Sequence, residues 1–115
     1  MELFNDAVTS AVERALDGVS QRQKVTANNI ANVATPGFKA SRVTFEESLA
    51  SAIQGGDPNR ARADVNEADT AARADGNNVL LEEETQILIK SGLQYEALVQ
   101  ALNYKFNALR SAMGT

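Results

Sequence analysis

The chain has no cysteine, no histidine and no tryptophan among its 115 residues. Without cysteine, neither a disulfide framework nor a thiolate metal site can form. Without histidine, it lacks a common zinc ligand, the usual general base at neutral pH and the partner that activates a serine or cysteine nucleophile. These absences exclude much of enzyme chemistry.

The chain also has no excess of positive charge. Its formal net charge is -4, and acidic and basic residues are mixed along it. A nucleic-acid phosphate track requires a dense positive stripe, so we expect no nucleic-acid partner. The hydrophobic content of 43% is typical of a folded chain, and the length fits one domain.

No long hydrophobic run is present, since 79–81 and 87–89 are only short apolar triplets. We therefore expect no transmembrane span. The N-terminus carries Glu2 and Asp6 where a secretory signal would be basic, so export, if it occurs, is expected to need no cleaved signal peptide.

Catalytic motifs are missing as well. The only carboxylate cluster is 82–84, where adjacent positions point around a helix instead of converging. There is no phosphate-binding glycine motif, and Arg73 occupies a position where a calcium loop resembling Asp75-Gly76 would need an oxygen ligand. We predict that the protein is not an enzyme, with no catalytic residue, cofactor, metal or small-molecule substrate.

Two long helices are predicted at the ends of the chain. Apolar residues recur at helical spacing over 1–34, and Gly18 is the weak point of that helix. Over 79–115 they recur every seven residues, and from Tyr95 onward at alternating steps of four and three, which predicts a coiled-coil packing seam. The seam residues are Leu81, Leu88, Tyr95, Val99, Leu102, Phe106, Leu109 and Met113.

The middle of the chain, residues 35–78, is predicted to contain a Pro-Gly turn, a short helix over about 44–53 and an extended linker. Pro36 fixes its own φ, and Gly37 readily takes the positive φ of a type II turn. Between 54 and 78 the only large apolar residue is Val65, so we expect this stretch to supply no core.

These elements predict an all-α fold, an elongated antiparallel hairpin of the two long helices with a turn, a short helix and an irregular linker between them. Helices of 30 or more residues run to about 45 to 50 Å, beyond any compact domain of this size. The apolar surface of the second helix is wider than one neighbour can cover. We infer that other subunits cover it.

The stretch ANNIANVATPGFKA, residues 27–40, resembles the signature of the bacterial flagellar basal body rod and hook proteins. The motif and turn residues are Asn28, Asn29, Ile30, Ala31, Asn32, Thr35, Pro36, Gly37 and Phe38. The C-terminal half, from DGNNVLLEEE at 75–84 onward, is similar to the last helix of the same family. Only about 40 residues separate the helices, which favours a short proximal-rod member over relatives with large inserted domains.

The resemblance implies a structural subunit of the flagellar rod, whose two helices form one rod-core domain. It also implies partners: copies of itself, other rod proteins, and ring and export-gate components of the basal body. Delivery would use the flagellar type III export apparatus. A helical adaptor or secretion chaperone is the alternative, because it too would be small, acidic and rich in amphipathic helix.

The roles of the motif asparagines stay open between two readings. Their amides could bond backbone groups near a helix end or across a subunit boundary, or could be solvated and cap locally. Likewise Phe38 and the seam leucines could be plain core, interface or both.

Overall fold

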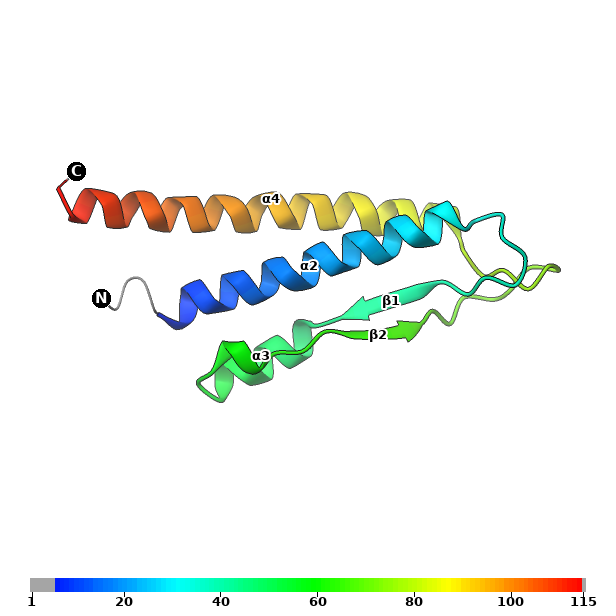
Figure 1. The fold of residues 1–115 in the computed structure, drawn as a ribbon, viewed down its shortest axis with the longest axis horizontal. Coiled ribbons are helices and arrows are strands. Elements are labelled where there is room, and N and C mark those ends of the chain that lie inside the picture. The colour runs from blue at the N-terminus through cyan, green and yellow to red at the C-terminus, as the bar shows by residue number, and fades with distance from the viewer. Residues whose placement is uncertain (1–5, 115) are drawn as a thin grey trace.

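The elements of this protein lie side by side in a single layer. The computed structural model describes residues 6–114, with α2 (Ala7–Ala31), β1 (Ser41–Thr44), α3 (Glu46–Gln54), the 3₁₀ helix η1 (Pro58–Arg60), β2 (Asp64–Glu67) and α4 (Leu81–Ala112). Figure 1 shows α2 in the middle, α4 along one side of it, and the strands and α3 along the other. The Cα atoms span 63 × 29 × 14 Å, so the molecule is long and flat.

The two long terminal helices are confirmed as an antiparallel pair. At the start of α2, the Asp6 side chain accepts a hydrogen bond from the backbone N–H of Thr9 (2.8 Å), as a helix N-cap does. The first turn of α4 carries three glutamates, 82–84, and its last turn carries Arg110. Charges of these signs suit the helix dipole.

The Pro-Gly turn after α2 forms as predicted. The carbonyl of Thr35 accepts a hydrogen bond from the N–H of Phe38 (3.2 Å), and Gly37 has φ of +76°. This is the geometry of a type II turn, in which the third residue needs positive φ. The chain therefore reverses here, and the next segment runs back along α2.

The prediction of an all-α fold is wrong in the middle of the chain. β1 and β2 pair antiparallel, with Val43 opposite Val65 and Ser41 opposite Glu67. Each strand holds one valine among polar residues, which is too short and too polar a pattern to predict a strand. The predicted short helix over 44–53 is confirmed as α3.

The expectation that residues 54–78 supply no core is also wrong. Pro58 is buried, and Ala68 is buried with Ala40 and Val79. Small residues suffice here because the layer is thin and the neighbouring backbone approaches closely. The segment therefore packs on α2 and β1 instead of extending away as a linker.

The main apolar cluster is small. It consists of Val19 on α2, Val43 on β1 and Phe45, with partly buried neighbours that include Leu49 and Leu98. The radius of gyration is 17.7 Å, against about 13 Å for a compact domain of this length. No helix within residues 6–114 is long and apolar enough to cross a membrane.

Candidate functional site

Asn29 of the motif is the polar centre of the molecule. Its side-chain N–H groups donate to Oε1 of Glu84 on α4 (2.8 Å) and to the carbonyl of Ser41 on β1 (2.9 Å). Its Oδ1 accepts from the N–H of Ser41 (3.1 Å). Asn29 and Glu84 are 1% and 0% exposed, so this one amide joins α2, β1 and α4 inside the fold.

Arg42 balances the buried carboxylate of Glu84. Its Nη1 lies 2.6 Å from Oε2 of Glu84, and its Nη2 lies 2.7 Å from Oε1 of Glu83. Burial alone would lower the pKa of Arg42, but the hydrogen bonds that Arg42 donates to these two carboxylates outweigh burial and raise it. We call Asn29, Ser41, Arg42 and Glu84 the Asn29 cluster. Arg42 neutralises the charge of Glu84 in a place where an unpaired charge would be costly.

A second set of polar contacts holds the turn after α2. The Asn77 side chain donates to the carbonyls of Asn32 (2.9 Å) and Thr35 (2.8 Å). Arg73 donates to the carbonyls of Val79 (2.7 Å) and Val33. The carbonyls of Asn32, Val33 and Thr35 lie at and beyond the end of α2 and have no partner within the helix, so the loop before α4 supplies donors to them.

The other motif residues have more local surroundings. The Asn32 side chain donates to the carbonyl of Asn28 (2.8 Å) and accepts from the hydroxyl of Thr35 (3.0 Å). The remaining motif residues are mostly accessible: Asn28, Ala31, Pro36 and Gly37 are exposed, and Ile30 and Phe38 are half-buried. Of the three asparagines, Asn29 alone makes its side-chain contacts inside the fold.

The predicted seam of α4 divides into two groups. Leu109 is buried and Leu88, Val99 and Leu102 are half-buried, so these residues are partly or wholly covered within the chain. The other four remain exposed on one side of the helix, and we call them the side row: Leu81, Tyr95, Phe106 and Met113.

The chain is similar to known proteins along nearly its whole length. The model of a family described as flagella basal body rod protein matches residues 12–39, which include most of the motif. The flagellar basal body rod protein FlgB of Bacillus subtilis (strain 168) is 34% identical, with 98% of this chain and 97% of the relative covered. The chain belongs to the FlgB family of flagellar basal body rod proteins.

Other FlgB proteins match over similar lengths. The protein of Borrelia hermsii is 36% identical, covering 91% of this chain and 95% of its own. That of Aeromonas hydrophila is 28% identical, covering 98% and 97%. Each match covers nearly the whole of both chains. The short segment between the two long helices is therefore no departure from the length of these FlgB relatives.

Sequence reasoning missed the Asn29 cluster in this FlgB-family chain. Glu84 was interpreted only as a charge in the first turn of a helix, and Arg42 was not singled out. The available signal was spacing, because Glu84, Ser91, Leu98 and Lys105 recur every seven residues, and all four are buried or half-buried. Because three of these four residues are polar, the hydrophobic pattern did not reveal that this row of α4 is covered by the rest of the chain.

Two ion pairs on the surface of the FlgB-family fold set its response to acid. The Arg22 guanidinium donates to both carboxylate oxygens of Glu46 (2.6 and 2.8 Å) and holds the pKa of Glu46 at about 2. The hydrogen bond from Lys105 likewise lowers the pKa of Asp6 to about 2, and it joins the start of α2 to α4. Both carboxylates are therefore stabilised in the charged form by folding.

Acid is expected to weaken the fold through Glu46 and Asp6. The pKa values of both carboxylates are lower in the folded protein than in the unfolded chain. The two residues therefore contribute fully to the free energy of unfolding above about pH 4.5, and this contribution is lost as the pH falls toward 2. For the half-exposed Glu46 pair, the loss is about 1 kcal/mol or less. Urea denaturation at several pH values measures it.

The matched variants for this prediction are Arg22→Met and Arg62→Met. Arg22→Met removes the partner of Glu46 and should flatten part of the decline between pH 4.5 and 2. Arg62 forms no ion pair within residues 6–114, so Arg62→Met should leave the pH profile unchanged. An equal decline in wild type and Arg22→Met would contradict the assignment to Glu46.

Proposed function

We propose that this chain is a structural subunit of the proximal rod of the bacterial flagellar basal body. It polymerises through its terminal helices, which act as one rod-core domain, and contributes to the torque-transmitting shaft and the wall of the export channel. Its partners are copies of itself, other rod proteins, and ring and export-gate components. The rod that it joins crosses the periplasm.

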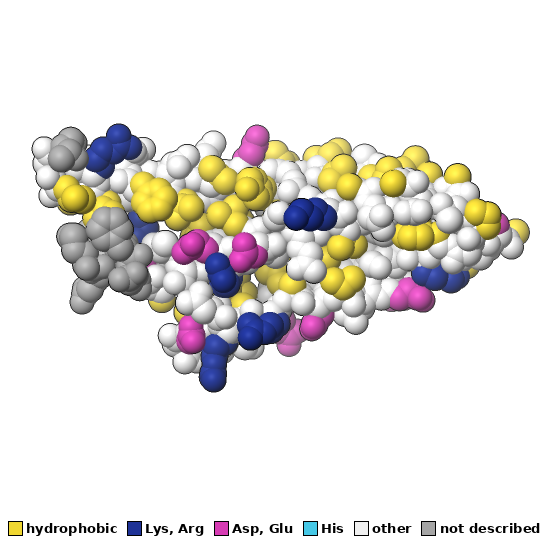
Figure 2. All heavy atoms as spheres, viewed as in Figure 1, with side chains coloured by type: hydrophobic (Ala, Val, Ile, Leu, Met, Phe, Trp, Pro, Cys, Tyr) yellow, Lys and Arg dark blue, Asp and Glu magenta, His cyan; other side chains and the backbone are white. Residues whose placement is uncertain are grey.

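One observation carries this proposal, namely the apolar surface that a single-layer molecule leaves in water. Besides the side row, α4 exposes Ile89, Leu93 and Tyr104, which we call the outer row. At about 100° per residue, Leu93 lies roughly 160° around the helix from the buried Leu109. The outer row therefore faces away from α2, and Figure 2 shows hydrophobic side chains gathered along α4.

The two rows require different neighbours. The side row lies beside the contact with α2 and the outer row lies opposite to it, so one added helix cannot cover both. Full burial of a side chain of this size contributes about 1.5–3 kcal/mol. Since Phe106 and Leu93 are 48% and 64% exposed, covering the rows recovers a substantial part of that energy at each position.

Aspartate in either row is expected to block assembly while leaving the hairpin folded. Phe106→Asp tests the side row and Leu93→Asp tests the outer row. Each is expected to abolish rods and motility, because a carboxylate would have to be buried without a partner. Electron microscopy of basal bodies and a soft-agar motility assay measure this, and circular dichroism checks that the helices persist.

Asn66→Asp on the exposed strand β2 is the matched control, because it adds the same charge away from α4. It should assemble normally. Normal rods in both row variants would refute assembly through the exposed surface of α4. A discrete, stoichiometric complex of the purified protein with one partner, seen by light scattering, would instead favour the helical adaptor or secretion chaperone.

A further inference from the structure

A groove of about 400 Å³ runs between α2, β1 and α4, and we call it the basic groove because three of its four charged lining residues are basic. Three cations line it, Arg22, Arg42 and Lys90, against the single carboxylate of Glu46. The two arginines are held by Glu46 and by the carboxylates at 83 and 84. Lys90 is exposed and forms no ion pair within residues 6–114, so its charge is available to a partner.

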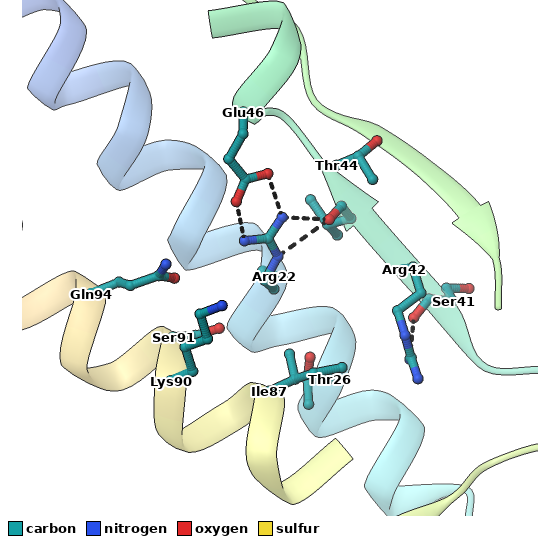
Figure 3. Close-up of a pocket in the computed structure, with 11 residues that line it drawn as sticks. Arg22, Thr26, Ser41, Arg42, Thr44, Glu46, Ile87, Lys90, Ser91 and Gln94 are labelled. Carbon is teal, nitrogen blue, oxygen red and sulfur yellow. Dashed lines mark hydrogen bonds and ion pairs between the residues drawn. The ribbon is translucent and has the colours of Figure 1, made fainter. Parts of the chain in front are cut away.

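The same groove contains a buried hydroxyl without a partner. Ser91 is 1% exposed, and its Oγ forms no hydrogen bond with the described part of the chain. Oε1 of Gln94, one turn further along α4, is also unpaired. Figure 3 shows Lys90, Ser91 and Gln94 on adjacent turns of α4, across the groove from Arg22 and Thr26.

These groups define the chemistry of an occupant. A buried hydroxyl left unpaired destabilises the protein, and a ligand that bonds it would recover that energy. Lys90 and Ser91 can both donate, so a carboxylate satisfies them together. An adjoining polar group can donate to Gln94. The groove is thus suited to an acidic side chain carried on a protein segment.

A second groove, of about 320 Å³, offers the complementary charge. It is lined by Glu13, Arg14, Leu16, Asp17 and Ser20 of α2, and by Tyr95 and Leu102 of α4. Arg14 pairs with Asp17 at 3.2 Å, whereas Glu13 is exposed and forms no ion pair among the described residues. The unpaired charge of this groove is therefore negative.

The two grooves lie on different faces of the helical hairpin. On α2, Glu13 and Thr26 are separated by about 140° at roughly 100° per residue, and on α4 Lys90 and Tyr95 are separated by about the same angle. Glu13 therefore cannot reach Lys90 within one copy. Two exposed, opposite and unpaired charges on opposite faces can meet only between copies.

We propose that the basic groove of one copy receives Glu13 of a second copy, whose carboxylate bonds Lys90 and Ser91. This inference rests on the proposed rod function, and it names the sideways contact between copies. Because different surfaces meet, the contact is head-to-tail, and a pair of copies still has one free groove of each kind. Such a contact repeats around a wall instead of stopping at a dimer.

Carbodiimide cross-linking tests the pair directly, since it joins an ammonium to a carboxylate only when the two are in contact. An equal mixture of ¹⁵N-labelled and unlabelled full-length protein is cross-linked at concentrations that favour assembly. We expect a ladder of dimers, trimers and larger species on a denaturing gel. Mass spectrometry should find a Lys90–Glu13 peptide that carries both isotopes.

Matched variants separate this contact from general association. Lys90→Ala and Glu13→Ala should each reduce the ladder at least tenfold, whereas Lys24→Ala and Glu96→Ala, at exposed positions outside both grooves, should leave it intact. A ladder that ends at the dimer, or Lys90 joined to another carboxylate, overturns the proposal. So does the absence of any Lys90 cross-link.

Charge reversal in cells separates failure of this contact from failure of the rod function. Lys90→Glu is expected to impair motility, and adding Glu13→Lys is expected to restore it by reversing the pair. If Lys90→Glu assembles normal rods while Phe106→Asp does not, the contact is refuted and the rod function stands. If none of these variants affects rods, both are refuted.

Discussion

Replacing Glu84 by alanine is expected to destabilise the fold by about 3–5 kcal/mol, the usual cost of removing one partner of a buried ion pair. Glu84 is fully buried, and its loss leaves Arg42 without its 2.6 Å partner and Asn29 with an unpaired N–H. Those two residues lie on β1 and α2, so the contacts of both elements with α4 weaken together. Urea denaturation followed by circular dichroism measures the loss.

Glu83→Ala is the matched control for Glu84→Ala. Glu83 is the preceding residue and also contacts Arg42, but its side chain is 42% exposed. Removing an exposed partner costs about 1 kcal/mol or less, because water can replace it. Equal effects of the two substitutions would show that burial of Glu84 does not decide its contribution.

Replacing a glycine inside a helix usually stabilises a protein, but giving position 18 a side chain is expected to destabilise this one. A Cβ atom there would lie 2.4 to 2.7 Å from three ring carbons of Phe45, which is well inside contact distance. The ring packs directly on the helix backbone and is only 7% exposed, so it has little room to move. Gly18→Val is therefore expected to destabilise the protein by about 3 kcal/mol, at the upper end of overpacking costs.

Gly92→Ala on α4 is expected to have the opposite effect and to stabilise the protein. The nearest atom to a Cβ at this position is 3.8 Å away, an ordinary contact distance. Alanine is better than glycine in a helix interior by about 1 kcal/mol, so this substitution should stabilise the protein by up to that amount. Thermal unfolding compares both variants with wild type, and a stabilising Gly18→Val would contradict the packing of Phe45 on α2.

The sequence predicted the parts of this fold that depend on local chemistry. Helical periodicity predicted both long helices, and Pro36-Gly37 predicted the turn, because backbone preferences decide these features over a few residues. One line of the contact between α2 and α4 was also predicted, through Leu88, Leu102 and Leu109. The motif around Asn29 predicted the family.

The remaining features depend on contacts between distant residues. The buried line of α4 that begins with Glu84 and Ser91 was not predicted, because hydrophobic periodicity does not count polar residues. The hydrophobic pattern alone could not predict whether Phe106 is buried within the chain or exposed on its surface. The strands were missed because part of their stability comes from side chains of α2, which no local pattern reports.

Those side chains also decide which border of the strand pair another chain can join. Asn29 binds both backbone groups of Ser41, as a neighbouring strand would, and Arg22 donates to the carbonyl of Val43 at 2.7 and 3.2 Å. These backbone groups on the outer edge of β1 are therefore already hydrogen-bonded and cannot pair with an incoming strand. All four residues of β2 are exposed. In a crowded wall of identical copies, unwanted sheet growth is thus restricted to one direction, and the charges of Asp64 and Glu67 discourage it there.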